Sequence, residues 1–143
     1  MNATTLDRDA LSAPQTSTAT HPLTLWAGRI LTALAGLGLV SSAAMKLRHG
    51  EEFVGQWVGH LGFREASLGA VGVVELVCAL LYLTPQTSVL GTLLTLAYLG
   101  GATAAHVRIG ESPTAPIVLG VLAVAGLWLR DPRVRALLPL KRA

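Results

Sequence analysis

Four apolar runs separated by short polar stretches dominate the chain. They cover residues 23–45, 66–83, 88–105 and 112–129. A helix needs about 20 mostly apolar residues to cross a hydrocarbon layer of about 30 Å. Arg29 is the only charged residue in the first run, and Glu75 is the only one in the second. The pattern therefore predicts four membrane-spanning helices.

Proline marks two of the boundaries between these runs. The second run stops before Pro85, in the short turn TPQTS. The fourth run begins at Ser112 and Pro113, where the serine suits a helix N-cap and the proline suits the first helical position. This run is the shortest, and we expect Arg130 at its end to reach back to the membrane interface.

Composition supports a membrane protein over a soluble one. Hydrophobic residues make up 52% of the 143 residues and charged residues only 13%, and the mean hydropathy is +0.56. A soluble domain usually carries about 25% charged residues, and a chain of this length cannot bury so much apolar surface. We therefore predict an all-α fold, an integral membrane bundle of four helices.

The charge of the chain is basic, but its pattern does not indicate nucleic-acid binding. The formal net charge is +3, and five of the eleven Lys and Arg residues lie in the last fourteen positions. They are not interleaved with aromatic residues, as they are in many nucleic-acid-binding surfaces. The single cysteine, Cys78, lies in an apolar run. It excludes both an internal disulfide and a CxxC redox pair.

Basic residues also predict the orientation in the membrane. Residues 1–22 have no apolar periodicity and are expected to form a flexible tail, and residues 131–143 form a basic one. Together with Arg29 and Arg130, these tails hold seven basic residues, against four in the connections on the other side. Cytoplasmic segments carry the excess of Lys and Arg. We therefore expect residues 23–130 to span the membrane, with both termini in the cytoplasm.

A cleaved signal peptide is the competing explanation for the first run. The small residues of SSAAM offer a cleavage site after an apolar stretch. A signal peptide also needs a cationic segment before that stretch. Here Arg8 is flanked by Asp7 and Asp9, so we expect the first run to remain as a membrane span.

Glu75 is the most informative polar residue within the runs. An acidic side chain at the centre of a spanning helix costs about 2.5–3.5 kcal/mol on insertion scales, so it seldom faces lipid. In the predicted orientation, the first run ends at Lys46 and the third ends at His106 and Arg108, on the same side of the membrane. The candidate polar site is Lys46, Glu75, His106 and Arg108.

Simpler interpretations of the basic members of this site remain open. Lys46 and Arg48 suit interfacial anchors whose charged groups reach water. His106 suits a helix end, where the helix dipole favours a cation. A metal site is not expected, because His49, Glu51, Glu52 and His60 show no HxxxH or HExxH spacing.

Small and polar residues recur at helical spacing in the runs, which is typical of helices that pack closely in lipid. The expected stripes are Gly28, Thr32, Ala35, Leu39, Ser42 and Lys46; then Leu68, Gly72, Glu75, Ala79 and Tyr82; and then Thr95, Tyr98, Ala102 and His106. Gly72, Gly100 and Gly101 are candidate packing positions. Trp26, Tyr82 and Trp128 suit the aromatic belts at the membrane interfaces.

The connection between the first two runs contains a further apolar pattern. Phe53, Trp57 and Leu61 are four residues apart, which predicts a short helix. Such a helix would lie on the membrane surface or cap the bundle.

The segment from AGRILTALAGLGLVSSAAMKL to LWLRDPRVRAL, residues 27–137, resembles the DoxX-like family of small bacterial membrane proteins. The most specific part runs from LYLTP through YLGGATAAHVRIGE, followed by LWLRDP. The resemblance implies a multi-pass protein of the bacterial inner membrane. It maps family motif positions onto Lys46, Glu75, Gly100, Gly101, His106 and Arg108. For some relatives it implies a membrane subunit of a thiosulfate:quinone oxidoreductase or of another redox-linked complex, although the lone Cys78 argues against self-contained thiol chemistry.

Two functions fit these observations. The first is a non-catalytic membrane module that holds a membrane or periplasmic redox protein, or copies of itself, with Lys46, Glu75 and His106 as a structural polar network. The second is a quinone-linked oxidoreductase subunit, in which His106 or Lys46 donates to a quinone carbonyl and Glu75 relays a proton. The sequence has no ligand set for a cofactor, and this favours the first.

Overall fold

The computed structural model describes residues 22–138, which form helices joined by short turns, with no strand in that range. The helices are α1 (Pro22–Arg48), α2 (Glu51–Gly55), η1 (Gln56–His60, a π-helix), α3 (Ala66–Leu83), α4 (Ser88–Arg108), α5 (Thr114–Arg130) and α6 (Pro132–Leu137). This confirms the all-α prediction. The predicted N-terminal tail, apart from Pro22, lies outside the described residues, as do the last five residues of the C-terminal tail.

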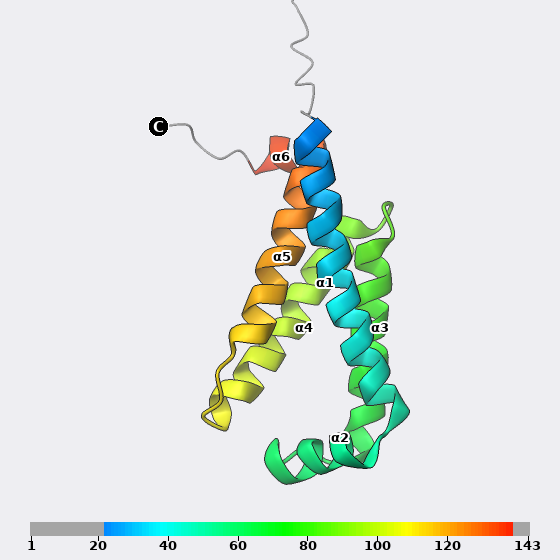
Figure 1. The fold of residues 1–143 in the computed structure, drawn as a ribbon, viewed down its shortest axis with the longest axis vertical. Helices are drawn as coiled ribbons and strands as arrows, with labels where there is room; N and C mark the ends of the chain where they lie inside the picture. The colour runs from blue at the N-terminus through cyan, green and yellow to red at the C-terminus, as the bar shows by residue number, and fades with distance from the viewer. Residues whose placement is uncertain (1–21, 139–143) are drawn as a thin grey trace, which may run out of the picture.

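The four long helices form a closed ring in which α1 packs against α3 and α5, and α4 packs against the same two helices. Figure 1 shows that the start of α1 and α6 lie at one end of this bundle, which we call the tail end. The opposite end, called the loop end, carries α2, η1 and the α4–α5 turn. The even number of long helices returns the described chain to the end where it began.

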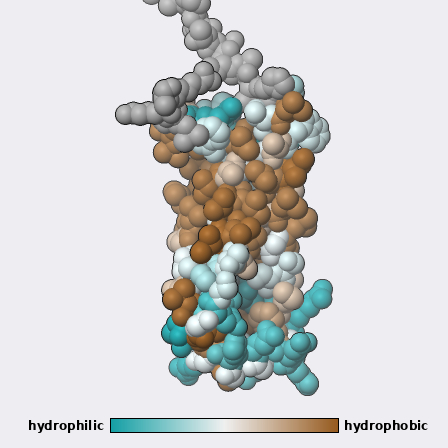
Figure 2. All heavy atoms as spheres, turned by 60° about the vertical axis from the view of Figure 1, so that its left-hand side comes forward, coloured by the Kyte–Doolittle hydropathy of each residue, from teal (hydrophilic) through white to brown (hydrophobic). Residues whose placement is uncertain are grey.

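The outer surface of the bundle suits a lipid environment. Helices α1, α3 and α4 are long and apolar enough to cross a membrane, whereas α5 is a shorter apolar helix of 17 residues. Leucine and valine side chains such as Leu37, Val73, Leu93 and Val121 are about half exposed or more. Figure 2 shows these residue types as a hydrophobic belt, with hydrophilic residues gathered at the loop end. The helices therefore indicate a multi-pass membrane protein.

The predicted helix limits agree closely with the structure, with differences at the ends. The second run coincides with α3, while α1 continues to Arg48 and α4 to Arg108. The N-cap prediction for Ser112 is wrong, because α5 begins at Thr114 and has no side-chain cap. The Ser112 hydroxyl instead lies 2.6 Å from the Thr114 hydroxyl.

The core forms where small residues let the helices approach. Its fully or nearly buried members are Ala35, Leu39, Ala79, Tyr82, Leu99 and Ala123. A Cβ atom on Gly126 of α5 would lie 2.7 Å from the hydroxyl oxygen of Thr32 in α1. A Cβ atom on Gly91 of α4 would lie 2.2 Å from the backbone nitrogen of Tyr82 in α3. Neither contact leaves room for a larger residue.

Tyr82 corrects one sequence prediction. It is fully buried and is not a belt aromatic, because its position on α3 points toward α5 instead of lipid. Its hydroxyl donates to the carbonyl of Ala123 at 3.4 Å. Arg130 donates to the carbonyl of Tyr82 at 3.1 Å, and its guanidinium lies 5.6 Å from the ring centroid. Arg130 is therefore tied to α3.

The connection between α1 and α3 contains the predicted helix, split into α2 and η1. Trp57 is its buried residue. The Trp57 indole donates to the Ser67 hydroxyl at 3.2 Å, and its ring centroid lies 4.9 Å from that of Phe63. These contacts fix η1 to the start of α3, so the connection covers the loop end of the bundle.

Candidate functional site

A buried ion pair joins α1 to α3. The Lys46 Nζ atom lies 2.8 Å from Glu75 Oε2, and the two side chains are 9% and 3% exposed. Lys46 also donates to the Ser42 hydroxyl at 2.7 Å. The structure therefore brings two of the sequence-predicted site residues together, with Ser42 of the predicted α1 stripe beside them.

Local helix geometry explains why this pair forms. Side chains on a helix tilt toward its N-terminus, so Lys46, near the end of α1, extends back along its own helix to Ser42. On α3, Gly72 lies one turn before Glu75, and a Cβ atom there would be 3.0 Å from the Lys46 Cβ. The missing side chain at Gly72 thus allows the close helix contact that buries both charges.

Residues from two other helices surround the pair. The Lys46 ammonium lies 5.7 Å from the ring centroid of Phe53 in α2. Tyr98 of α4 is close enough to Glu75 for the two side chains to interact. Cys78, one turn after Glu75 on α3, is a buried free thiol. Four elements therefore contribute to this polar interior.

The chemistry of the pair follows from its burial. A buried charge is stable only when it is paired and hydrogen-bonded. Lys46 and Glu75 meet this condition with each other, so neither requires a proton, ligand or ion to offset its charge. The arrangement is suited to holding α1 and α3 in one register.

His106 and Arg108 lie elsewhere, contrary to the sequence expectation that His106 joins Lys46 and Glu75. The Nδ1 atom of His106 is 2.9 Å from Glu111 Oε2. The other carboxylate oxygen of Glu111 is 2.6 Å from the Nε2 atom of His60. Both histidines therefore meet one carboxylate at the loop end.

Arg108 contacts the same connection. Its guanidinium donates to the carbonyl of Leu61 and lies 5.2 Å from the ring centroid of Phe63. Arg108 is exposed, so it belongs to the surface of the loop end and not to the buried pair. Glu111 is the residue that sequence analysis missed here, because a lone acid in a turn carries no spacing signal.

Of the three candidate packing glycines, one lies in a helix contact and two lie on the surface. Gly72 lies in the α1–α3 contact, as described above. Gly100 and Gly101 are exposed, and a Cβ atom on either would meet nothing within 4 Å. They do not pack the helices of this chain together, which corrects the expectation for these two positions.

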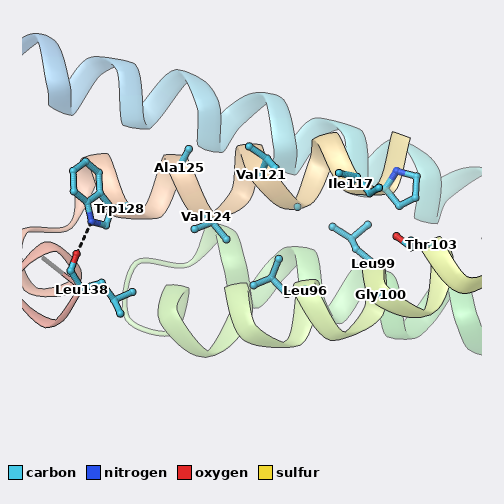
Figure 3. A pocket seen from close by; sticks show the side chains of 12 residues that line it. Leu96, Leu99, Gly100, Thr103, Ile117, Val121, Val124, Ala125, Trp128 and Leu138 are labelled. Atoms are coloured by element: carbon cyan, nitrogen blue, oxygen red, sulfur yellow. Dashed lines mark hydrogen bonds between the residues drawn. The ribbon is translucent and has the colours of Figure 1, made fainter. Parts of the chain in front are cut away.

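Gly100 instead lines an open apolar groove between α4 and α5. The groove has a volume of about 630 Å³, and its wall runs from Thr103 and Pro116 to Trp128 and Leu138. Figure 3 shows leucine and valine side chains along it, with the Trp128 indole bonded to the Leu138 carbonyl at 3.2 Å. A second cavity, of about 380 Å³, lies beside α2 and is lined by Met45, Arg48, Gly50, Glu52, Phe53 and Gln56. Neither cavity is lined by Lys46 or Glu75.

Metal-ligating residues are not clustered in the described part of the chain. Residues 22–138 contain no group of three or more His, Cys, Asp or Glu side chains that could hold a metal ion. In particular, His49 bonds the carbonyl of Leu47 at 3.1 Å, whereas His60 bonds Glu111. The structure thus does not bring these two histidines of the connection together.

Comparison with known protein families agrees with this architecture. The family model described as the DoxX-like family matches residues 30–127. The chain belongs to the DoxX-like family. The matched segment contains most of α1, all of α3 and α4, and most of α5. It therefore includes both the buried ion pair and the Glu111 contacts. No curated protein and no solved structure matches the chain significantly.

Proposed function

We propose that this DoxX-like protein is a non-catalytic membrane module whose helices are held in register by the Lys46–Glu75 ion pair. The observation that carries this proposal is the mutual neutralisation of two buried charges at a close helix contact. A general acid or base must reach the proton it transfers. Here each charged group is already engaged by the other, which favours a structural role.

The module would hold a partner protein within or beside the membrane. A second copy of the chain, a membrane protein or a periplasmic redox protein fits this role. The apolar outer faces of the helices support the bilayer as the immediate environment.

Breaking one half of the pair tests the structural role. Removing one partner of a buried ion pair typically costs about 3–5 kcal/mol, because the other charge stays buried and unpaired. We expect Glu75→Gln and Lys46→Met each to lower the free energy of unfolding in detergent by about this amount. The double variant Lys46→Met/Glu75→Leu should recover most of the loss, since it leaves no buried charge.

A matched control and a composition measurement separate this role from a redox one. Arg48→Gln removes an exposed charge at the same end of α1 and should leave stability nearly unchanged. The wild-type protein and the double variant are purified in mild detergent for absorption spectra and lipid extraction. A quinone or pigment that is present in the wild type and lost in the stable double variant would overturn the structural role in favour of a quinone-linked oxidoreductase subunit.

We also propose the bacterial inner membrane as the location, with both termini in the cytoplasm. The support is the excess of basic residues on the two tails, together with the common end of the bundle at which the start of α1 and α6 lie (Figure 1). Reporter fusions at each terminus measure the orientation. A cytoplasmic signal from only one terminus would contradict it.

A further inference from the structure

The cavity beside α2 combines opposite charges with apolar surface. Arg48 and Glu52 supply the charges, Gln56 supplies an amide, and Met45 and Phe53 supply the apolar wall. Its volume of about 380 Å³ falls within the range of about 300–1,000 Å³ that is typical of small-molecule sites. The cavity therefore has both the size and the mixed lining of a binding site.

Helical spacing explains how these residues come to line one cavity. Met45 and Arg48 are three positions apart in the last turns of α1, and Glu52 and Gln56 are four positions apart in α2 and η1. Residues three or four apart lie on the same face of a helix. A Cβ atom on Gly50, which lies between the two faces, would meet nothing within 4 Å. The connection therefore leaves the space between the two faces open.

The two charged residues of the cavity do not neutralise each other. Within residues 22–138, the ion pairs join Lys46 to Glu75 and two histidines to Glu111, and none includes Arg48 or Glu52. A guanidinium group only donates hydrogen bonds, whereas a carboxylate only accepts them. The cavity thus offers a donor group for an anion on α1 and an acceptor group for a cation on α2. It suits a ligand that carries both charges.

The type of cation follows from the remaining lining residues. Phe53 is half-buried, and its ring centroid already lies 5.7 Å from the Lys46 ammonium. A single ring so engaged does not form the cage of several aromatic residues that recognises a quaternary ammonium. The Glu52 carboxylate and the Gln56 amide oxygen instead suit a primary ammonium, which has three N–H donors.

The exposed face of α1 leads directly into the cavity. Ile30, Leu34, Leu37 and Met45 lie on this face and are 50–68% exposed, and Arg48 follows Met45 by three positions. Helix α1 packs against α3 and α5 and is long and apolar enough to cross a membrane, so this face meets the acyl chains of lipid. The cavity lies at the loop end, which carries α2 (Figure 1) and where the hydrophobic belt gives way to hydrophilic residues (Figure 2).

We propose that this cavity binds the headgroup of an aminophospholipid, which carries a phosphate and a primary ammonium. Arg48 donates to the phosphate, Glu52 and Gln56 accept from the ammonium, and the acyl chains lie along the exposed face of α1. The Lys46–Glu75 pair takes no part in the binding. Failure of this proposal and failure of the structural role of that pair are therefore separate results.

Native mass spectrometry of the full chain in detergent micelles tests the headgroup preference. The protein is titrated with phosphatidylethanolamine, phosphatidylglycerol and phosphatidylcholine that have identical acyl chains. All three contain a phosphate, but only the first has a primary ammonium. Since a hydrogen bond to a charged group distinguishes them, we expect the dissociation constant for phosphatidylethanolamine to be roughly tenfold lower than for the other two.

Two variants assign the two halves of the headgroup. Glu52→Gln should weaken the binding of phosphatidylethanolamine by roughly tenfold, to the level of the other lipids, because the charge that meets the ammonium is lost. Arg48→Gln should weaken all three lipids, since they share the phosphate. Both residues are exposed, so thermal unfolding in lipid-free detergent should be unchanged and verifies that each variant is folded.

A neighbouring acid and a soluble analogue provide the controls. Glu51 is also exposed but does not line the cavity, so Glu51→Gln should keep the preference. Phosphoethanolamine has the same charged groups without acyl chains, and an equimolar amount should not displace the lipid. The proposal is overturned by equal dissociation constants for the three lipids, by a preference that persists in Glu52→Gln or disappears in Glu51→Gln, or by displacement with equimolar phosphoethanolamine.

Discussion

The two ends of the bundle are held together by different kinds of contact. Toward the tail end, helices meet through glycines and buried apolar residues, as at Gly126 against Thr32 and Gly91 against Tyr82. At the loop end, η1 meets the α4–α5 turn through His60 and Glu111, which are 59% and 40% exposed. Close packing of buried backbone cannot loosen without cost, whereas exposed hydrogen bonds exchange readily with water. The tail end is therefore held by close packing, whereas the contact between η1 and the α4–α5 turn is open to water.

The largest effect in this comparison is expected at Gly91. An added Cβ atom would overlap the backbone of Leu81 and Tyr82 at 2.2–2.5 Å, and backbone cannot move aside as a flexible side chain does. Gly91→Ala should lower the free energy of unfolding by about 1–3 kcal/mol or more, the usual cost of overpacking. Chemical or thermal unfolding in detergent measures the change.

Gly100→Ala is the matched control on the same helix. Its Cβ would enter open space, and alanine is the better helix former by up to about 1 kcal/mol. We expect its stability to be unchanged or slightly raised. If Gly91→Ala and Gly100→Ala lowered the free energy of unfolding equally, close packing at Gly91 would not explain the loss.

A smaller effect is expected when the Tyr82 hydroxyl is removed. Tyr82→Phe keeps the ring in the core and removes the donor to the Ala123 carbonyl. A neutral hydrogen bond contributes about 0.5–1.5 kcal/mol net, so the unfolding free energy should fall by no more than this. The same unfolding experiment measures it, and a loss as large as that of Gly91→Ala would disagree with this account.

The smallest effect on global stability is expected at the loop end. Arg108→Gln removes the contacts with Leu61 and Phe63, but an exposed interaction of this type contributes only about 1 kcal/mol or less. Hydrogen exchange of residues 51–61 should accelerate while the unfolding midpoint hardly moves. Arg64→Gln is the control, because Arg64 contacts Trp57 and Ser67 through its backbone carbonyl. Unchanged exchange in Arg108→Gln would show that Arg108 does not hold residues 51–61 in place.

The sequence was most informative about the features that a lipid environment restricts, namely the helix limits and the pairing of a buried charge. Glu75 in an apolar run needs a partner, and helical spacing placed Lys46 on the facing stripe of the neighbouring helix. The helix limits followed from Pro85 and from the length of each run. Lipid allows few arrangements of backbone and charge, so hydropathy and spacing were enough for these features.

The remaining features depend on tertiary geometry that spacing does not encode. Tyr82 was predicted both as a member of the α3 packing stripe and as a belt aromatic near a helix end, and its contact with the Ala123 carbonyl of α5 shows that it is buried. Likewise, His106 was expected near Lys46 and Glu75, whereas the turn at Gly110 brings Glu111 to it. The packing of α3 against α5 and the conformation of the α4–α5 turn determine these contacts, and residue spacing along a single helix encodes neither.

The ion pair also bears on how the chain enters the membrane. Helices α1 and α3 are consecutive spans, so the lysine is already in place when the glutamate arrives. An isolated α3 would carry its carboxylate into lipid at a cost of about 2.5–3.5 kcal/mol, and α1 offsets that cost on docking. We expect the first two spans to integrate as a hairpin, with the second retained less efficiently when the first is replaced by an unrelated apolar segment.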